Sequence, residues 1–121
     1  MNKKDINILK NNNINLDIAL EYFTNINTYN EMLRLWLLSS NKKIIRLIEA
    51  INGNDNNLIN TMIYNIHSDA ECYGFRRIES VSDYYLEKAR GNDYNYIKEN
   101  INKLINLIED MQEVIEKYFN I

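Results

Sequence analysis

Apolar residues near the C-terminus recur at alternating steps of four and three positions, and this spacing constrains the fold more than any other feature. Steps of this size place side chains on one side of an α-helix, which has 3.6 residues per turn. Ile105 and Phe119 widen the stripe to the width that a bundle helix buries. The pattern predicts one long C-terminal helix, whose core-facing residues are Ile97, Ile101, Leu104, Ile108, Met111, Ile115 and Tyr118.

Earlier segments have the same helical spacing and are separated by glycine-containing breaks. The chain has no proline and only three glycines. Gly53 and Gly91 lie in the stretches INGNDNN and ARGNDYN, which are typical of a helix end, a turn and a new helix start. Strand-like alternation of apolar and polar residues is absent, so the sequence predicts an all-α protein.

The predicted helices follow one another closely. A short helix is expected over residues 16–23, and a long one begins at Thr28, where Glu31 stands three residues on and completes a capping box. Two more are expected to begin near Asp55 and around Gly74 or Phe75, before the C-terminal helix.

Connections this short force neighbouring helices to run antiparallel. We therefore expect an up-down-up-down four-helix bundle with the short N-terminal helix as a lid. Residues 14–121 then form a single domain, and residues 1–13 are expected to be a frayed N-terminus.

Composition narrows the classes of function. A single cysteine, Cys72, excludes an internal disulfide and gives no sign of an oxidising compartment. No apolar run approaches the ~20 residues of a membrane span, and the N-terminus lacks the apolar core of a signal peptide. The net charge is −3 and the basic residues are scattered, which argues against nucleic acid as a partner. These features predict a soluble cytoplasmic protein with neither a nucleic-acid nor a membrane partner.

Several residues stand at the spacing of a signalling family. The matching positions are Tyr29, Leu33, Trp36, Leu47, the Asn54-Asp55 turn, the Gly74-Phe75 pair and the GND stretch from Gly91 to Asp93. On these residues the chain, from about Leu16 to Phe119, resembles the histidine-containing phosphotransfer (HPt) domains of bacterial phosphorelays. The resemblance implies an HPt-like helical bundle and a partner that is a response-regulator receiver domain, a hybrid sensor kinase or both.

The resemblance also implies where the phosphoacceptor should stand. In the family the reactive histidine lies nine residues after the Asp of the first turn and ten before the Gly of the later pair. Counting from Asp55 and counting back from Gly74 both give Tyr64, without a gap. In this register Ser68 takes the place of a small glycine and His67 that of a lysine. The phosphoacceptor motif is therefore degenerate.

This substitution changes the chemistry that is available. In the family a neutral imidazole attacks a phosphoaspartate, and an ordinary histidine pKa of ~6.5 leaves that nucleophile neutral at cell pH. A phenol ordinarily titrates near pH 10 and needs a base to activate it. Its phosphate ester would also be too stable to pass on to an aspartate. Relay through Tyr64 is therefore not expected.

His67 is the only other route to transfer. It is three residues after Tyr64, so the two share roughly one side of a helix and are ~4.5 Å apart along its axis. The family's helpful lysine would then be replaced by Ala70. The structural alternative is that His67 is an inert, exposed polar residue.

Other chemistries have weaker support. In the stretch HSDAE, His67 and Glu71 share a side of a helix while Asp69 points the opposite way, so three metal ligands cannot converge. Asp69 and Glu71 are expected to raise the pKa of Cys72, which disfavours a nucleophilic thiol. Neither a metal nor a cofactor is expected.

Three functions follow as hypotheses. The first is a non-enzymatic module that docks a receiver domain through Tyr64, His67, Ser68 and Glu71 without accepting phosphate. The second is an active phosphotransfer protein with His67 as its catalytic residue. The third is a structural bundle that acts by oligomerisation, because the C-terminal stripe leaves Phe119 and Ile121 at its end. A monomer or weak dimer is expected.

Overall fold

The computed structural model describes residues 4–121, and this part of the chain is all-helical. It contains six helices and no strand; a single bridge joins Ile14 to Phe75. The helices are α1 (Ile6–Lys10), α2 (Leu16–Phe23), α3 (Ile26–Asn52), α4 (Asn56–Tyr73), α5 (Arg76–Arg90) and α6 (Tyr94–Phe119). The prediction of an all-α protein is confirmed.

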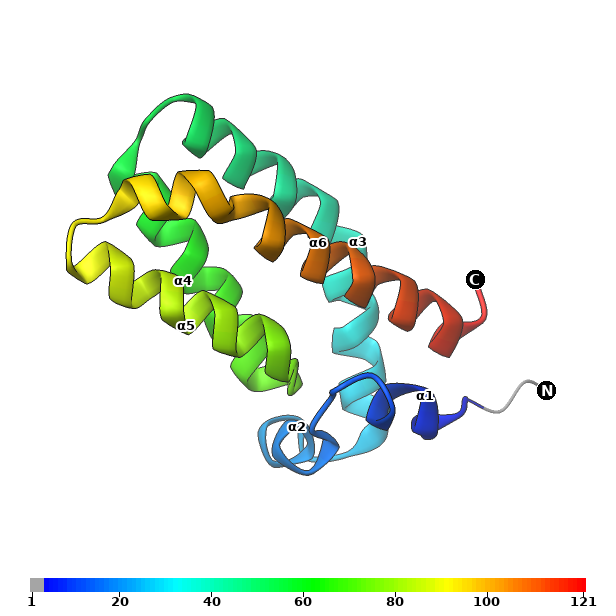
Figure 1. Ribbon diagram of the computed structural model, residues 1–121. Coiled ribbons are helices and arrows are strands. Elements are labelled where there is room, and N and C mark those ends of the chain that lie inside the picture. The colour runs from blue at the N-terminus through cyan, green and yellow to red at the C-terminus, as the bar shows by residue number, and fades with distance from the viewer. Residues whose placement is uncertain (1–3) are drawn as a thin grey trace.

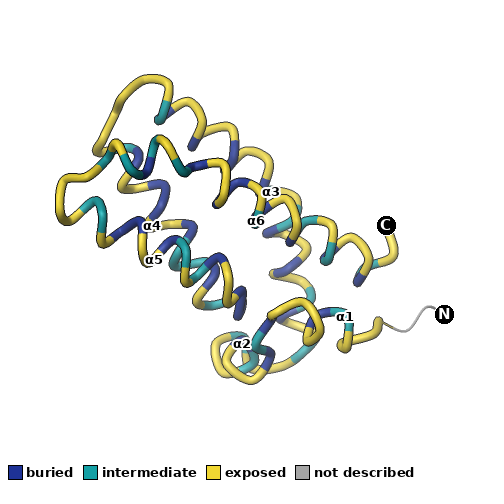
Figure 2. Tube along the Cα trace, viewed as in Figure 1, coloured by how far each residue is buried: buried dark blue, intermediate teal, exposed yellow. Residues whose placement is uncertain are grey.

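The four longer helices lie side by side, and the chain reverses direction at each of the turns between them (Figure 1). α4 packs against α3 and α5, and α6 packs against α5 and α3. α2 packs against α3 and α4, while α1 packs against α6. The buried positions lie on the sides of the helices that face one another (Figure 2).

Most residues of the predicted apolar stripes form the core, but Ile48, which helical spacing predicts on the stripe of α3, is 40% exposed. Every residue of the C-terminal stripe from Ile97 to Tyr118 is buried, and Trp36 is also buried, against Phe75. On α4 the inward residues are Ile59, Met62, Ile63, Ile66, Ala70 and Tyr73. No helix within residues 4–121 has the length and apolar character needed to cross a membrane.

Asparagine and aspartate side chains cap the starts of all the described helices except α5, whose N-cap, Phe75, makes no side-chain hydrogen bond. The Asp55 carboxylate accepts a hydrogen bond from the Leu58 amide at 3.1 Å, as expected for the start of α4. The predicted start of α3 at Thr28 is wrong. The helix begins at Ile26, because the Asn25 side chain accepts the Thr28 amide at 2.9 Å and is itself the N-cap.

The N-terminal segment also differs from expectation. Residues 1–3 of the expected frayed segment lie outside the described residues. Farther along, the Asp5 side chain caps the short helix α1, and Leu9 is fully buried in the core. The Asn13 carbonyl and the Asn15 amide bond to the chain at residues 74–76, which fastens this segment to the α4–α5 junction. The burial of Leu9 and these backbone hydrogen bonds fix the N-terminal segment to the bundle, and neither could be predicted from the local sequence.

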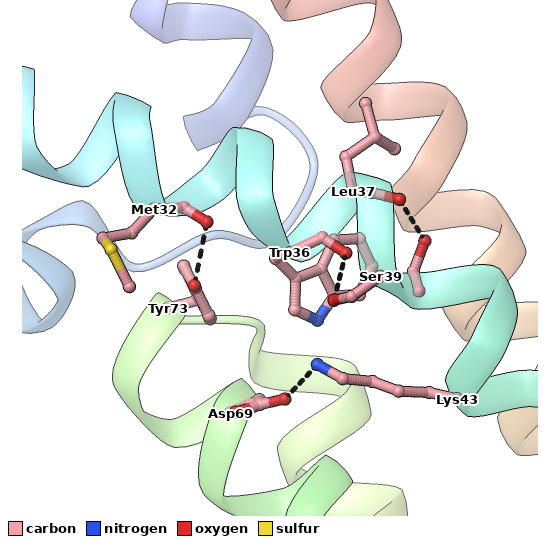
Figure 3. A network of polar contacts seen from close by, with 8 residues as sticks. Met32, Trp36, Leu37, Ser39, Lys43, Asp69 and Tyr73 are labelled. Carbon is pink, nitrogen blue, oxygen red and sulfur yellow. Dashed lines mark hydrogen bonds and ion pairs between the residues drawn. The ribbon is translucent and has the colours of Figure 1, made fainter.

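Polar contacts fix α4 against α3. The Lys43 ammonium forms an ion pair with the Asp69 carboxylate, and the Tyr73 hydroxyl donates to the Met32 carbonyl at 2.9 Å (Figure 3). Both contacts come from the α3 side of α4. These contacts hold one side of α4 against α3, so that its other sides face α5 and solvent.

Candidate functional site

The solvent-facing side of α4 carries most of the predicted docking residues. Tyr64, Ser68 and Glu71 follow one another at steps of four and three, so they lie on one side of the helix. The Tyr64 side is opposite the core residues of α4, and this residue is 59% exposed. Glu71 is exposed and Ser68 is partly exposed. The structure therefore brings these three residues together and places a phenol in the middle of the helix surface.

His67 is placed differently, and the expectation of an exposed histidine beside Tyr64 is wrong. Its side chain is only 18% exposed. The Nδ1 atom lies 3.3 Å from the Glu79 carbonyl oxygen and 3.2 Å from Ser82 Oγ, both on α5. The ring therefore lies against the α4–α5 interface, because α5 covers this edge of α4 and supplies both contacts to Nδ1.

Both contacts of His67 with α5 are made by Nδ1. The Ser82 hydroxyl has one proton and two carbonyl acceptors in reach, Ile78 at 2.6 Å and Glu79 at 3.1 Å. A carbonyl oxygen can only accept, so the contact with Glu79 is a hydrogen bond in the tautomer that carries its proton on Nδ1. In that tautomer Nε2 keeps the lone pair, and it lies 4.0 Å from Glu71 Oε2. The only free nitrogen thus lies beside a carboxylate, which would repel an approaching phosphoryl group.

Sequence reasoning missed Tyr22 as a neighbour of this surface. Tyr22 is on α2 and is more than half exposed. The Glu71 carboxylate raises the pKa of Tyr22, with smaller contributions from Cys72, burial, Glu79 and Glu21. The helix that carries Tyr22, α2, packs against α4. No local sequence signal indicates the effect of Glu71 on Tyr22, because it depends on how α2 packs across α4.

Cys72 and the acidic residues beside it form neither an activated thiol nor, among residues 4–121, a group of three metal ligands. Burial raises the pKa of the Cys72 thiol, and Glu71 and Asp69 raise it further, as predicted. A thiol of raised pKa is a poor nucleophile at neutral pH. Asp69 is turned to Lys43, away from His67. Within residues 4–121 no group of three or more His, Cys, Asp or Glu side chains could hold a metal ion.

Comparisons with protein-family models, with curated proteins and with solved structures found no match for this chain. The features available for proposing a function are therefore those of the exposed side of α4 and of α2. They are the Tyr64 phenol, the small residue Ser68, the Glu71 carboxylate and the Tyr22 phenol on α2.

Proposed function

We propose that this protein is an HPt-like four-helix bundle, formed by α3 to α6, that docks a receiver domain in the cytoplasm without accepting phosphate. A single observation carries the proposal. The side chain that projects from the middle of α4 is the Tyr64 phenol, whereas the only imidazole in the chain lies against α5. The resemblance of the surrounding turns to the HPt family supplies the class of partner, a response-regulator receiver or the hybrid sensor kinase that contains one.

Tyr64 supports docking and not transfer. An exposed tyrosine offers a rigid apolar ring and a polar hydroxyl, the combination that is enriched at protein interfaces. Within residues 4–121 no hydrogen bond links its hydroxyl to a base. A phenol without a base is a weak nucleophile at neutral pH. Tyr64 is therefore suited to contact a partner.

The docking surface is defined as Tyr64, Ser68, Glu71 and the edge of His67. Ser68 is small, so a partner can approach the helix closely between the larger side chains. We expect a transient interface at the small end, below ~1,200 Å² in total. Such a module would compete with a true phosphotransfer partner or hold a receiver in place.

Active transfer through His67 has less support. Its Nδ1 is occupied by α5, and its Nε2 lies beside Glu71. A receiver would have to displace the carboxylate and reach a side chain that is mostly covered. Phosphoryl transfer depends chiefly on positioning and charge neutralisation, and both are poor at this nitrogen.

The docking proposal predicts a specific pattern of binding. A ¹⁵N-labelled chain titrated with a panel of receiver domains should show shifts confined to the exposed side of α4 and to neighbouring α2. Tyr64→Ala should weaken binding about tenfold, equivalent to about 1.4 kcal/mol. The matched control is Tyr84→Ala, since Tyr84 is also exposed but lies on α5 and packs on Tyr96.

Two results would contradict this proposal. One is the absence of shifts with every receiver at millimolar concentration. The other is an equal loss of affinity in Tyr84→Ala and Tyr64→Ala, which would place the contact elsewhere on the bundle.

A further inference from the structure

A second surface lies on α3. Four aliphatic side chains are left exposed there: Leu35, Leu38, Ile45 and Ile48. Leu38 is 74% exposed, the largest exposure of any large apolar side chain among residues 4–121. Leu38 and Ile45 are two helical turns apart and lie nearly in line, and Leu35 and Ile48 flank them by three residues on either side. Over about 20 Å of helix, α3 presents an apolar strip to solvent.

The strip is opposite the core-facing side of α3. Leu33, Trp36 and Leu47 are buried, and α2, α4 and α6 cover that side. Within the described chain no element packs over the strip. Its four side chains together expose an area on the order of a few hundred Å², comparable to the largest apolar patch of a typical monomer, which is often functional. The exposed residues Asn41 and Lys42 lie between Leu38 and Ile45.

We infer that this strip binds the same strip of a second copy, so that two α3 helices pair antiparallel about a two-fold axis. The positions are self-complementary under that symmetry. Leu38 and Ile45 are equally far from the midpoint between Asn41 and Lys42, so an antiparallel pair places Leu38 of one copy level with Ile45 of the other.

The flanking residues are also placed at equal distances from the midpoint between Asn41 and Lys42. Leu35 falls level with Ile48 of the second copy, and Arg34 falls level with Glu49. The four aliphatic residues of the strip thus fall level with aliphatic residues of the second copy, and Arg34 falls level with the oppositely charged Glu49, twice by symmetry. Neither Glu49 nor Arg34 forms an ion pair within residues 4–121, and the Arg34 guanidinium lies over the Phe119 ring, 4.5 Å from its centroid. Both charges are therefore free to pair between copies.

This match favours a second copy over an unrelated partner. The spacing of these residues is symmetric about one point of α3, so a second α3 in the opposite direction matches it. A helix from an unrelated protein would match it only by chance. One element opposes pairing, because Lys42 lies beside the two-fold axis and faces its own symmetry copy. Together with the small area, this repulsion predicts a weak dimer. The strip is on α3 and the docking surface is on α4, so a dimer would leave Tyr64 accessible.

Oligomeric mass measured against concentration tests the inference. Sedimentation velocity of the full chain from 1 µM to 1 mM should show the mass rising from 14.4 kDa toward twice that value. Leu38→Glu should remain monomeric throughout, because it buries two new charges against Ile45. Ile18→Glu is the control with the same chemical change on exposed α2, and it should dimerise like the wild type. Circular dichroism confirms that each variant is folded.

Charge variants test the register. Arg34→Glu and Glu49→Arg should each weaken dimerisation about tenfold, and the double variant should restore it, because the pair is exchanged without loss. Lys42→Ala should strengthen the dimer. A wild-type chain that is monomeric at 1 mM would overturn the inference. So would a dimer that persists in Leu38→Glu, or a double charge variant no tighter than its single parents, since either result would assign the contact to another face or another register.

Discussion

Gly74→Ala is expected to lower the free energy of unfolding by about 3 kcal/mol. Gly74 ends α4 with φ +78°, a left-handed conformation that costs any other residue stability. An added Cβ would also overlap the Asn15 carbonyl oxygen. That atom belongs to backbone held by the Asn15 amide, which donates to the Gly74 carbonyl at 2.8 Å, so it cannot move aside freely. Urea denaturation followed by circular dichroism measures the change.

Gly91→Ala is the matched control for this prediction. Gly91 also ends a helix, but its φ is −82° and the nearest atom to an added Cβ would be the Lys88 carbonyl oxygen at 3.6 Å, an ordinary contact. Stability should stay level or rise by up to about 1 kcal/mol, because alanine restricts the unfolded chain. If Gly74→Ala cost less than Gly91→Ala, the packing of residues 13–15 on the α4–α5 junction would be wrong.

The protein is expected to lose stability steeply at alkaline pH. Burial raises the pKa of Tyr73 and of Tyr85 to about 12, and it raises that of Tyr29 further. Each folded-state pKa lies above the unfolded value near 10, so the folded state holds its protons more tightly in this window. The resulting stabilisation is complete below pH 10 and is lost as the pH rises through about 12. Urea midpoints measured from pH 8 to 12 should be level at first and then fall.

Single substitutions separate this effect from general charge repulsion. Tyr73→Phe removes a hydroxyl that donates to the Met32 carbonyl, so it should cost about 1 kcal/mol at pH 8. The same variant should show a shallower fall above pH 10, because one buried proton is no longer released. Tyr84→Phe, at an exposed site, should leave the profile unchanged. A wild-type midpoint that stays constant to pH 12 would contradict the burial of these phenols.

The helices and their core were predictable because their information is local. The alternating steps of four and three from Ile97 to Tyr118 lie within a single helix, so the pattern can be recognised without knowing the rest of the fold. Every residue of that stripe is buried. The start of α3 was predicted at the wrong residue because two nearby residues can each act as an N-cap. Both Asn25 and Thr28 are good N-cap residues, and only the geometry shows that Asn25 accepts the Thr28 amide.

The candidate site shows where local information ends. Exposure of Tyr64 follows from the period of α4 alone, since it is opposite Ile59, Ile63 and Ile66. The direction of His67 does not, because it depends on which neighbour covers that edge of the helix. A contact with Ser82, fifteen residues along the chain, decides it. The influence of Glu71 on the pKa of Tyr22 likewise depends on how α2 packs against α4, which no spacing encodes.

The central claim is that position 64, and not position 67, faces the partner. Phosphoryl transfer from a labelled receiver tests it most directly, in the wild type and in a double variant that carries Tyr64→His and His67→Ala and so moves the sole imidazole by one turn. We predict no acid-labile label on the wild type and clear label on the double variant with a receiver that docks. Label on the wild type that His67→Ala removes, with none on the double variant, would contradict the account.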